Sequence, residues 1–143
     1  MSTASGPVQT QTPVVGLFTG QHVLAELDGI DAALLDDELF LRRTLEHVLD
    51  QAGATVCDVV SKQFDPQGVT VLALLSESHA SIHTYPEIGA LFVDVFTCGD
   101  RAQPELAVRL LAEALGTTAV QSKTIHRGGE RAVAGASMTW ETR

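Results

Sequence analysis

Strand-like segments outnumber helical ones in this chain, and several follow one another with no helix between them. Five ranges have the residue pattern of strands, and they are His22–Leu27, Thr55–Phe64, Val69–Ser76, Leu91–Cys98 and Ala119–His126. Strands that are adjacent in sequence pair most easily as antiparallel neighbours, because a parallel pair needs a long crossover connection. The pattern therefore predicts an antiparallel sheet with helices packed on one of its faces.

Two segments have the apolar spacing of helices that pack on such a sheet. The first begins near Asp36 or Asp37, either of which can cap it, and ends at Gly53. Its apolar stripe consists of Leu41, Leu45, Val48, Leu49 and Ala52. The second runs from Pro104 to Leu115, stops at Gly116, and is expected to turn inward Leu106, Leu110, Leu111 and Ala114. A sheet covered on one side only leaves its other side free, so a dimer is expected.

Two details refine the sheet. Asp65-Pro66-Gln67-Gly68 is a turn signal, which predicts that Thr55–Phe64 and Val69–Ser76 form a hairpin. Alternation within Leu91–Cys98 places Leu91, Val93 and Val95 on one face. The other face of that strand carries Phe92, Asp94, Phe96 and Cys98.

Composition limits the class of protein. A chain of 143 residues is the size of one domain, and its net charge of −9 opposes binding to nucleic-acid phosphates. Its two cysteines, Cys57 and Cys98, are too few for a disulfide framework. The longest apolar run, Val71–Leu75, is too short to cross a membrane, and residues 1–13 lack the features of a secretory signal. We expect a cytoplasmic protein without nucleic-acid or membrane partners, with a disordered lead-in over 1–13, one domain over 14–127 and a flexible tail over 128–143.

The residues with chemical potential are concentrated in Ser76–Glu87, which holds three serines, two histidines and two glutamates. The segment follows one strand-like run and precedes another, so it is expected to be a loop of the kind that carries functional sites. One hypothesis is a Ser–His hydrolase built from Ser78 or Ser81 with His83 and Asp94, although no glycines of a nucleophile elbow flank the serines.

Two other hypotheses fit the same segment. His79 and His83 could bind a metal together with Glu87 or Cys98. Alternatively, the polar side chains only satisfy a tight connection between two strands.

The residues of this segment match a known pattern. The run Ser-Glu-Ser-His-Ala-Ser-Ile-His-Thr-Tyr-Pro-Glu (76–87), followed by Val-Asp-Val-Phe-Thr-Cys-Gly-Asp (93–100), closely resembles the short prokaryotic S-adenosylmethionine decarboxylases. These are pyruvoyl enzymes of polyamine synthesis. The likeness extends through Gly20–Leu27 and Phe64–Val69 and covers roughly residues 20–127.

The resemblance implies a two-layer α+β sandwich, a homodimer of cleaved protomers, and self-cleavage between Glu77 and Ser78. Ser78 would become a pyruvoyl cofactor that forms a Schiff base with the substrate amine and accepts the electrons released with CO2. The family assigns proton transfer during processing to the histidine that matches His83, with assistance from the hydroxyl at Thr70. It assigns the proton donor of decarboxylation to the cysteine that matches Cys98. No metal is implied.

The resemblance also suggests how substrate binds. Phe64 matches an aromatic residue near the adenine of S-adenosylmethionine, and Glu87 matches a pocket residue. Tyr85 stands where the family has Trp, and residues 88–92 replace a stretch with two tyrosines. The implied product is the aminopropyl donor for spermidine synthesis. Because aromatics are missing, a pyruvoyl decarboxylase of ornithine or arginine is the alternative. A non-catalytic relative is a third reading, and the presence of Ser78, His83 and Cys98 argues against it.

Overall fold

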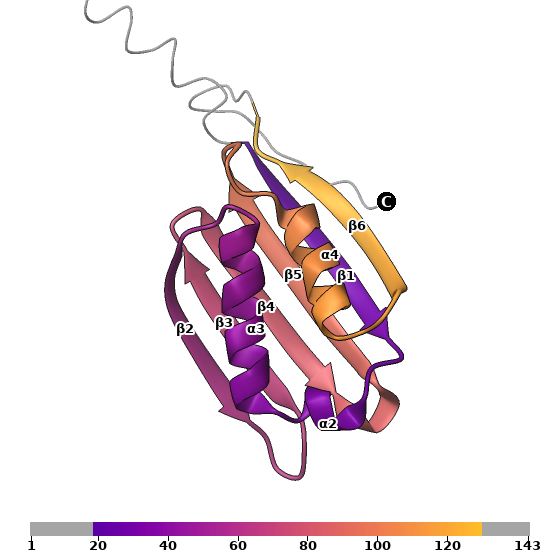
Figure 1. The fold of residues 1–143 in the computed structure, drawn as a ribbon. Coiled ribbons are helices and arrows are strands. Elements are labelled where there is room, and N and C mark those ends of the chain that lie inside the picture. The colour runs from indigo at the N-terminus through magenta and orange to yellow at the C-terminus, as the bar shows by residue number, and fades with distance from the viewer. Residues whose placement is uncertain (1–18, 130–143) are drawn as a thin grey trace, which may run out of the picture.

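Six strands form one sheet in the computed structural model, which describes residues 19–129. They are β1 (Gly20–Asp28), β2 (Val56–Gln63), β3 (Val69–Leu75), β4 (Ser78–Tyr85), β5 (Ala90–Cys98) and β6 (Ala119–Arg127). Their order across the sheet is β2-β3-β4-β5-β1-β6, and every neighbouring pair is antiparallel. The predicted antiparallel sheet is confirmed, and Figure 1 shows β1 inserted between β5 and β6.

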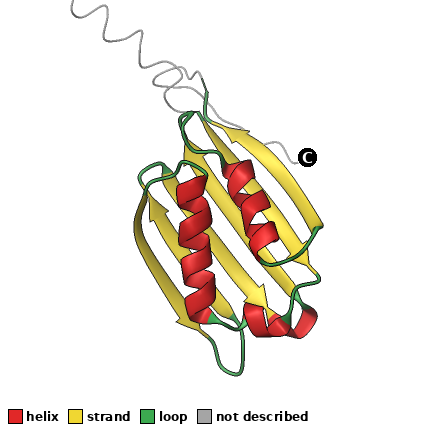
Figure 2. Cartoon of the chain, in the orientation of Figure 1, coloured by secondary structure: helices red, strands yellow, loops and turns green. Residues whose placement is uncertain are grey.

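The helices α3 (Glu38–Gln51) and α4 (Pro104–Ala114) lie side by side on one face of the sheet (Figure 1, Figure 2). This arrangement confirms the two-layer α+β sandwich. A four-residue helix, α2 (Ala32–Leu35), and a short 3-10 turn, η2 (Pro86–Ile88), complete the elements of the described residues. Neither of these short elements was predicted, because a single turn carries too little periodicity to stand out.

The ends of both long helices follow the sequence signals. The Asp37 carboxylate accepts a hydrogen bond from Phe40 N–H at 3.1 Å, as an N-cap does. Gly53 and Gly116 follow the two helices with positive φ angles of 88° and 74°. The inward stripe of α3 is confirmed, since all five of its residues are buried.

The inward stripe of α4 was placed slightly wrong. Ala114 is exposed and Leu106 and Leu110 are only half-buried. The buried residues of the helix are Pro104, Ala107, Val108, Leu111 and Ala112. Since the helix has 3.6 residues per turn, the stripe centres on Leu111 and rotates Ala114 toward solvent.

The segment that was expected to be a loop is instead the central strand β4. Its inward residues are Ala80, Ile82 and Thr84, and its outward residues are His79, Ser81, His83 and Tyr85. Only Ser76 and Glu77 lie between β3 and β4, so these strands form a second tight hairpin beside the predicted β2–β3 hairpin. The segment was not predicted as a strand because its outward side chains are polar and few apolar residues mark the alternation.

The sheet face opposite the helices remains uncovered in the single chain. Large apolar side chains lie exposed there, among them Leu24 on β1, Val60 on β2, Leu72 and Leu74 on β3, and Phe92 on β5. Within residues 19–129, no helix has both the length and the apolar character needed to cross a membrane. The segment 1–13 and all but two residues of 128–143 lie outside the described residues.

Candidate active site

The proposed cleavage site lies where β3 turns into β4, and the end of β5 lies beside it. The backbone N–H of Cys98 donates a hydrogen bond to the carbonyl oxygen of Glu77 at 3.2 Å. Ser78 pairs with Thr97 in the β4–β5 ladder. The Glu77 carboxylate accepts hydrogen bonds from Thr55 N–H at 3.1 Å and from Thr55 Oγ1 at 3.3 Å. The peptide between Glu77 and Ser78 is therefore fixed from both sides and lies next to Cys98.

Gly20, at the start of β1, leaves the space that the Cys98 thiol occupies. Gly20 pairs with Cys98 across β1 and β5. A Cβ at Gly20 would lie 3.2 Å from Cys98 Sγ, 2.9 Å from Thr97 O and 2.8 Å from the ring of Phe96. The glycine is thus needed for close approach rather than for backbone conformation.

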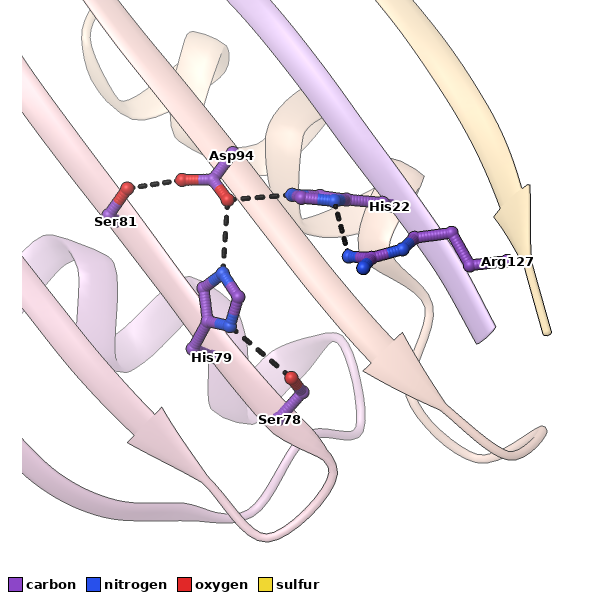
Figure 3. Close-up of polar contacts among 6 residues, drawn as sticks. All are labelled: His22, Ser78, His79, Ser81, Asp94 and Arg127. Atoms are coloured by element: carbon purple, nitrogen blue, oxygen red, sulfur yellow. Dashed lines mark hydrogen bonds and ion pairs between the residues drawn. The ribbon is translucent and has the colours of Figure 1, made fainter. Parts of the chain in front are cut away.

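A carboxylate on the uncovered face joins side chains from three strands (Figure 3). Oδ2 of Asp94 accepts hydrogen bonds from His22 Nε2 at 2.7 Å and from His79 Nε2 at 3.2 Å. Ser81 Oγ donates to the other oxygen, Oδ1. Burial raises the pKa of Asp94, but the hydrogen bonds from Ser81, His22 and His79 outweigh burial and hold the pKa below its usual value. Asp94 is therefore ionised at neutral pH.

The far ring nitrogens of the two histidines have their own partners (Figure 3). Nδ1 of His79 lies 3.3 Å from Ser78 Oγ, and Nδ1 of His22 lies 3.2 Å from Nη1 of Arg127. The Arg127 guanidinium also sits 4.4 Å above the centre of the Phe96 ring. A continuous chain of polar contacts thus runs from Arg127 through His22, Asp94 and His79 to Ser78.

This cluster differs from both site hypotheses drawn from residue types. Donor atoms of His22, His79 and Asp94 all lie within 4.8 Å of one another, which is close enough for a metal ion. The Arg127 guanidinium beside His22 opposes a cation there. His79 and His83, paired in the metal hypothesis, stand four residues apart on one strand, or about 13 Å, and do not converge. In the hydrolase hypothesis, His83 was paired with Asp94, but the histidines that contact Asp94 are His22 and His79.

The remaining predicted residues gather toward the other end of β4. Nδ1 of His83 lies 3.0 Å from Thr70 Oγ1, and the Tyr85 and Phe92 rings pack at 4.9 Å between centroids. His83 and Phe92 line an open hollow of about 530 Å³ on the uncovered face, together with Leu24, Ala25, Glu26, Val93, Asp94, Gln121, Ser122 and Lys123. Phe64 is 46% exposed just after β2, and Glu87 lies exposed in η2.

The predicted site residues therefore form two groups rather than one. Ser78 and His83 are five residues apart on the same extended strand, which separates their Cα atoms by about 16 Å. Thr70 stays with His83, whereas Glu77 and Cys98 stay with Ser78. Within one chain, His83 cannot reach the Ser78 hydroxyl.

Comparison with known proteins identifies the family. The family model for S-adenosylmethionine decarboxylase matches residues 21–128. The chain belongs to the S-adenosylmethionine decarboxylase family. An S-adenosylmethionine decarboxylase proenzyme from Prochlorococcus marinus (strain MIT 9313) is 49% identical over 117 residues, which cover 82% of this chain and 94% of the relative. An S-adenosylmethionine decarboxylase proenzyme 2 from Bacillus anthracis is 45% identical over 109 residues, covering 76% of this chain and 89% of the relative.

A solved structure agrees with the same family. The crystal structure of the adenosylmethionine decarboxylase from Aquifex aeolicus VF5 superposes with a TM-score of 0.70 at 34% sequence identity. The match covers 85% of this chain and 98% of that chain. The resemblance to the S-adenosylmethionine decarboxylases read from the motifs is therefore confirmed.

Sequence reasoning missed part of the polar cluster in this family member. His22 was not singled out, and His79 and Asp94 were considered only for sites that the structure does not form. All three occupy outward positions of neighbouring strands, and β1–β5 and β4–β5 pairing brings them together. Each of the three strands carries a polar residue at an outward position, which is the pattern that could have indicated the cluster. Whether these residues meet depends on the register of the strands, which the sequence does not specify.

Proposed function

We propose that this chain is a self-processing, pyruvoyl-dependent S-adenosylmethionine decarboxylase. Its product would be decarboxylated S-adenosylmethionine, the aminopropyl donor for spermidine synthesis. The observation that carries the proposal is the Glu77–Ser78 peptide itself, whose carbonyl accepts the Cys98 N–H at 3.2 Å in a chain of this family. The alternative of ornithine or arginine as substrate is not favoured, because the relatives are named for S-adenosylmethionine.

The geometry suits cleavage by an acyl shift. Ser78 Oγ would attack the carbonyl carbon of Glu77, and negative charge would develop on the carbonyl oxygen. The Cys98 N–H already points at that oxygen, so it acts as a preorganised oxyanion donor. Thr55 holds the Glu77 side chain and keeps the peptide from turning away.

The steps after the acyl shift balance without any external reagent but water. The amide becomes an ester between the main-chain carbonyl of Glu77 and Ser78 Oγ. Loss of the Ser78 α-proton then expels Glu77 with a new C-terminal carboxylate. The dehydroalanine left at position 78 takes up water, loses ammonia and becomes the pyruvoyl group at the start of residues 78–143. When formed, this group supplies the electron sink for loss of CO2.

Cys98 is placed to serve the decarboxylation that follows. Its half-buried thiol lies at the end of β5 beside the cleavage site, and Gly20 leaves room for it. A thiol can act as a general acid, so Cys98 is placed to deliver a proton to the carbon that has lost CO2.

A homodimer would bring the two groups of site residues together. A symmetric dimer that buries the uncovered sheet faces against each other can set the His83–Thr70 end of one chain over the Ser78–Cys98 end of its partner. Two observations support this assembly. The exposed apolar residues Leu24, Leu72 and Leu74 lie on that face, and His83 lies about 16 Å from Ser78 of its own chain.

The substrate would bind at the His83 end of the uncovered face. S-adenosylmethionine carries a sulfonium cation and an adenine, and aromatic faces attract both. The Tyr85–Phe92 pair offers two rings beside the hollow, so Phe92 compensates in part for the tyrosines that residues 88–92 lack. We also propose that Phe64 and Glu87 contact the substrate, as the resemblance implies. The cytoplasmic location stays a prediction.

The test is release of CO2 from purified, cleaved protein with each candidate substrate. S-adenosylmethionine, ornithine and arginine are supplied separately, each labelled at the carboxyl carbon. The proposal expects CO2 from S-adenosylmethionine alone and none with the Ser78→Ala variant. CO2 released only from ornithine or arginine would overturn the assignment of substrate.

A further inference from the structure

The proposed cleavage needs a base that takes the proton from Ser78 Oγ, and the contacts around Asp94 determine which group can act. Arg127 can only donate hydrogen bonds, so Nδ1 of His22, 3.2 Å from Arg127 Nη1, must be the accepting nitrogen of its ring. Nε2 of His22 then carries the proton and donates it to Asp94 at 2.7 Å. Asp94 Oδ2 is therefore the acceptor in its contact with His22.

The same reasoning sets the proton on His79. An ionised carboxylate has no proton to donate, so Nε2 of His79, 3.2 Å from Asp94 Oδ2, must carry its own. In a neutral imidazole, the other nitrogen then holds a lone pair. That nitrogen, Nδ1, is the one that lies 3.3 Å from Ser78 Oγ. His79 therefore faces the attacking hydroxyl as an acceptor.

Among the described residues 19–129, the other histidines near the sheet face are engaged elsewhere. His83 of the same chain is held by Thr70 at 3.0 Å and lies about 16 Å along the strand from Ser78. In the proposed homodimer the partner's His83 would serve the later step of processing, removal of the Ser78 α-proton from the ester, and not the first attack by Ser78 Oγ. His22 faces Asp94 and Arg127 with its two nitrogens. The arrangement Ser78–His79–Asp94 has the hydroxyl, imidazole and carboxylate order of a nucleophile, a base and the group that orients the base.

We propose that His79 is the base that removes the proton from Ser78 Oγ in the first step of self-cleavage, with Asp94 as its positioning residue. The inference rests on the proposed self-cleavage at Glu77–Ser78 and deepens it. The Ser78 Oγ proton passes to His79 Nδ1 as the bond from Oγ to the Glu77 carbonyl carbon forms. The bond from that carbon to Ser78 N then breaks, and the proton passes from His79 to Ser78 N, which leaves an ester and a free amine.

The groups around His79 favour this role. Asp94 faces it from β5, His22 from β1, and Arg127 lies beyond His22 on β6. His79 also lines a second hollow, separate from the one at His83, together with Asp58 of β2 and with Leu72 and Leu74 of β3. The hydrogen bond to Asp94 orients the ring and stabilises the imidazolium that forms when the proton arrives. His22 and Ser81 hold Asp94 in place from either side.

The test follows formation of the ester rather than cleavage alone. Freshly made full-length protein is incubated under native conditions with hydroxylamine, which cleaves an ester but leaves an amide intact, and intact masses are recorded over time. His79→Gln is compared with wild type and with His47→Gln, a matched control on the exposed side of α3. Circular dichroism establishes that each variant is folded.

The proposal expects His79→Gln to form the 1–77 hydroxamate about 10²-fold or more slowly than wild type, as loss of a general base does. His47→Gln should match wild type. Asp94→Asn should slow the same step, since it removes the charge that orients His79. If His79→Gln forms the 1–77 hydroxamate at the wild-type rate, the proposal is wrong. If wild type itself never cleaves, the proposed function fails instead, so the two failures are distinguishable.

A second measurement decides the matter if His79→Gln does not fold. The rate of wild-type ester formation is measured between about pH 5 and pH 8, the range in which histidines change charge. A base must be unprotonated to act, so the proposal expects the rate to fall as pH falls. A rate that stays constant across the range would contradict it.

Discussion

The backbone N–H of Cys98 donates to the carbonyl oxygen of Glu77 at 3.2 Å, across the end of the β4–β5 pair. In the proposed mechanism, the same residue therefore contacts the cleavage site through its backbone and presents its thiol to the finished active site. Backbone and thiol serve different steps in the proposed mechanism, so substitution of the side chain separates those steps.

Cys98→Ala is expected to lose far more decarboxylation than self-cleavage. The variant retains the N–H that faces Glu77 O, but it has no thiol to deliver a proton to the decarboxylated carbon. Activity per cleaved chain should fall by about 10²-fold or more, the usual contribution of a general acid. The measurement combines intact mass with CO2 release, and Cys57→Ala is the control. An equal loss of both activities would contradict the division of roles.

Gly20→Ala should destabilise the protein and disturb the thiol. The new methyl group would lie 2.8 Å from the Phe96 ring and 2.9 Å from Thr97 O, so the β1–β5 pair must shift. Overpacking of this kind costs about 1–3 kcal/mol, which urea unfolding can measure. If Gly20→Ala unfolds at the same urea concentration as wild type, the close approach at Gly20 is not needed for stability.

The polar cluster predicts a specific dependence of stability on pH. The pKa of Asp94 is lowered, because hydrogen bonds from Ser81, His22 and His79 outweigh the effect of burial. A carboxyl with a lowered pKa in the folded state stabilises the protein above its unfolded pKa of about 3.9, and this contribution disappears as pH falls through the folded value. The difference in unfolding free energy between wild type and Asp94→Asn should therefore shrink on acidification.

This difference is best measured by urea unfolding in a Ser78→Ala background, so that every chain stays whole. Glu113→Gln, exposed on α4, is the control for the general effect of removing a charge. A wild-type advantage over Asp94→Asn that is unchanged in acid would mean that the Asp94 carboxylate is not stabilised by this network.

The proposed homodimer predicts complementation between two inactive chains. A chain with His83→Ala keeps Ser78, and a chain with Ser78→Ala keeps His83. If each site combines Ser78 of one chain with His83 of its partner, the His83→Ala chain should be cleaved only when the two are expressed together. Intact mass of the co-purified heterodimer gives the readout.

Two results would count against the shared site. One is cleavage of the His83→Ala chain when it is expressed alone, and the other is an uncleaved heterodimer. As a control for the interface, Leu72→Glu places a charge on the uncovered face and should abolish complementation along with the dimer seen by light scattering.

Much of the fold could be predicted because its signals are local. Asp37 caps α3, Pro104 begins α4, and the Asp65–Gly68 turn joins β2 to β3. Each signal depends on a few neighbouring residues and needs no knowledge of the rest of the chain. The antiparallel sheet followed from the succession of strands.

The arrangement of the site could not be predicted, because it depends on long-range pairing. β4 resembled a loop, since its outward side carries His79, Ser81 and His83 in place of apolar residues. His22 and Asp94 are 72 residues apart in sequence, and only the β1–β5 register brings them within 2.7 Å. The separation of His83 from Ser78 became visible only when the segment between them proved to be an extended strand.

The most direct test of the account is the intact mass of freshly purified protein under denaturing conditions. The account predicts two chains, residues 1–77 and residues 78–143, the second with a pyruvoyl group in place of Ser78. The Ser78→Ala variant should give one uncleaved chain. A single wild-type chain with Ser78 intact, or cleavage at any other peptide bond, would contradict the central claim.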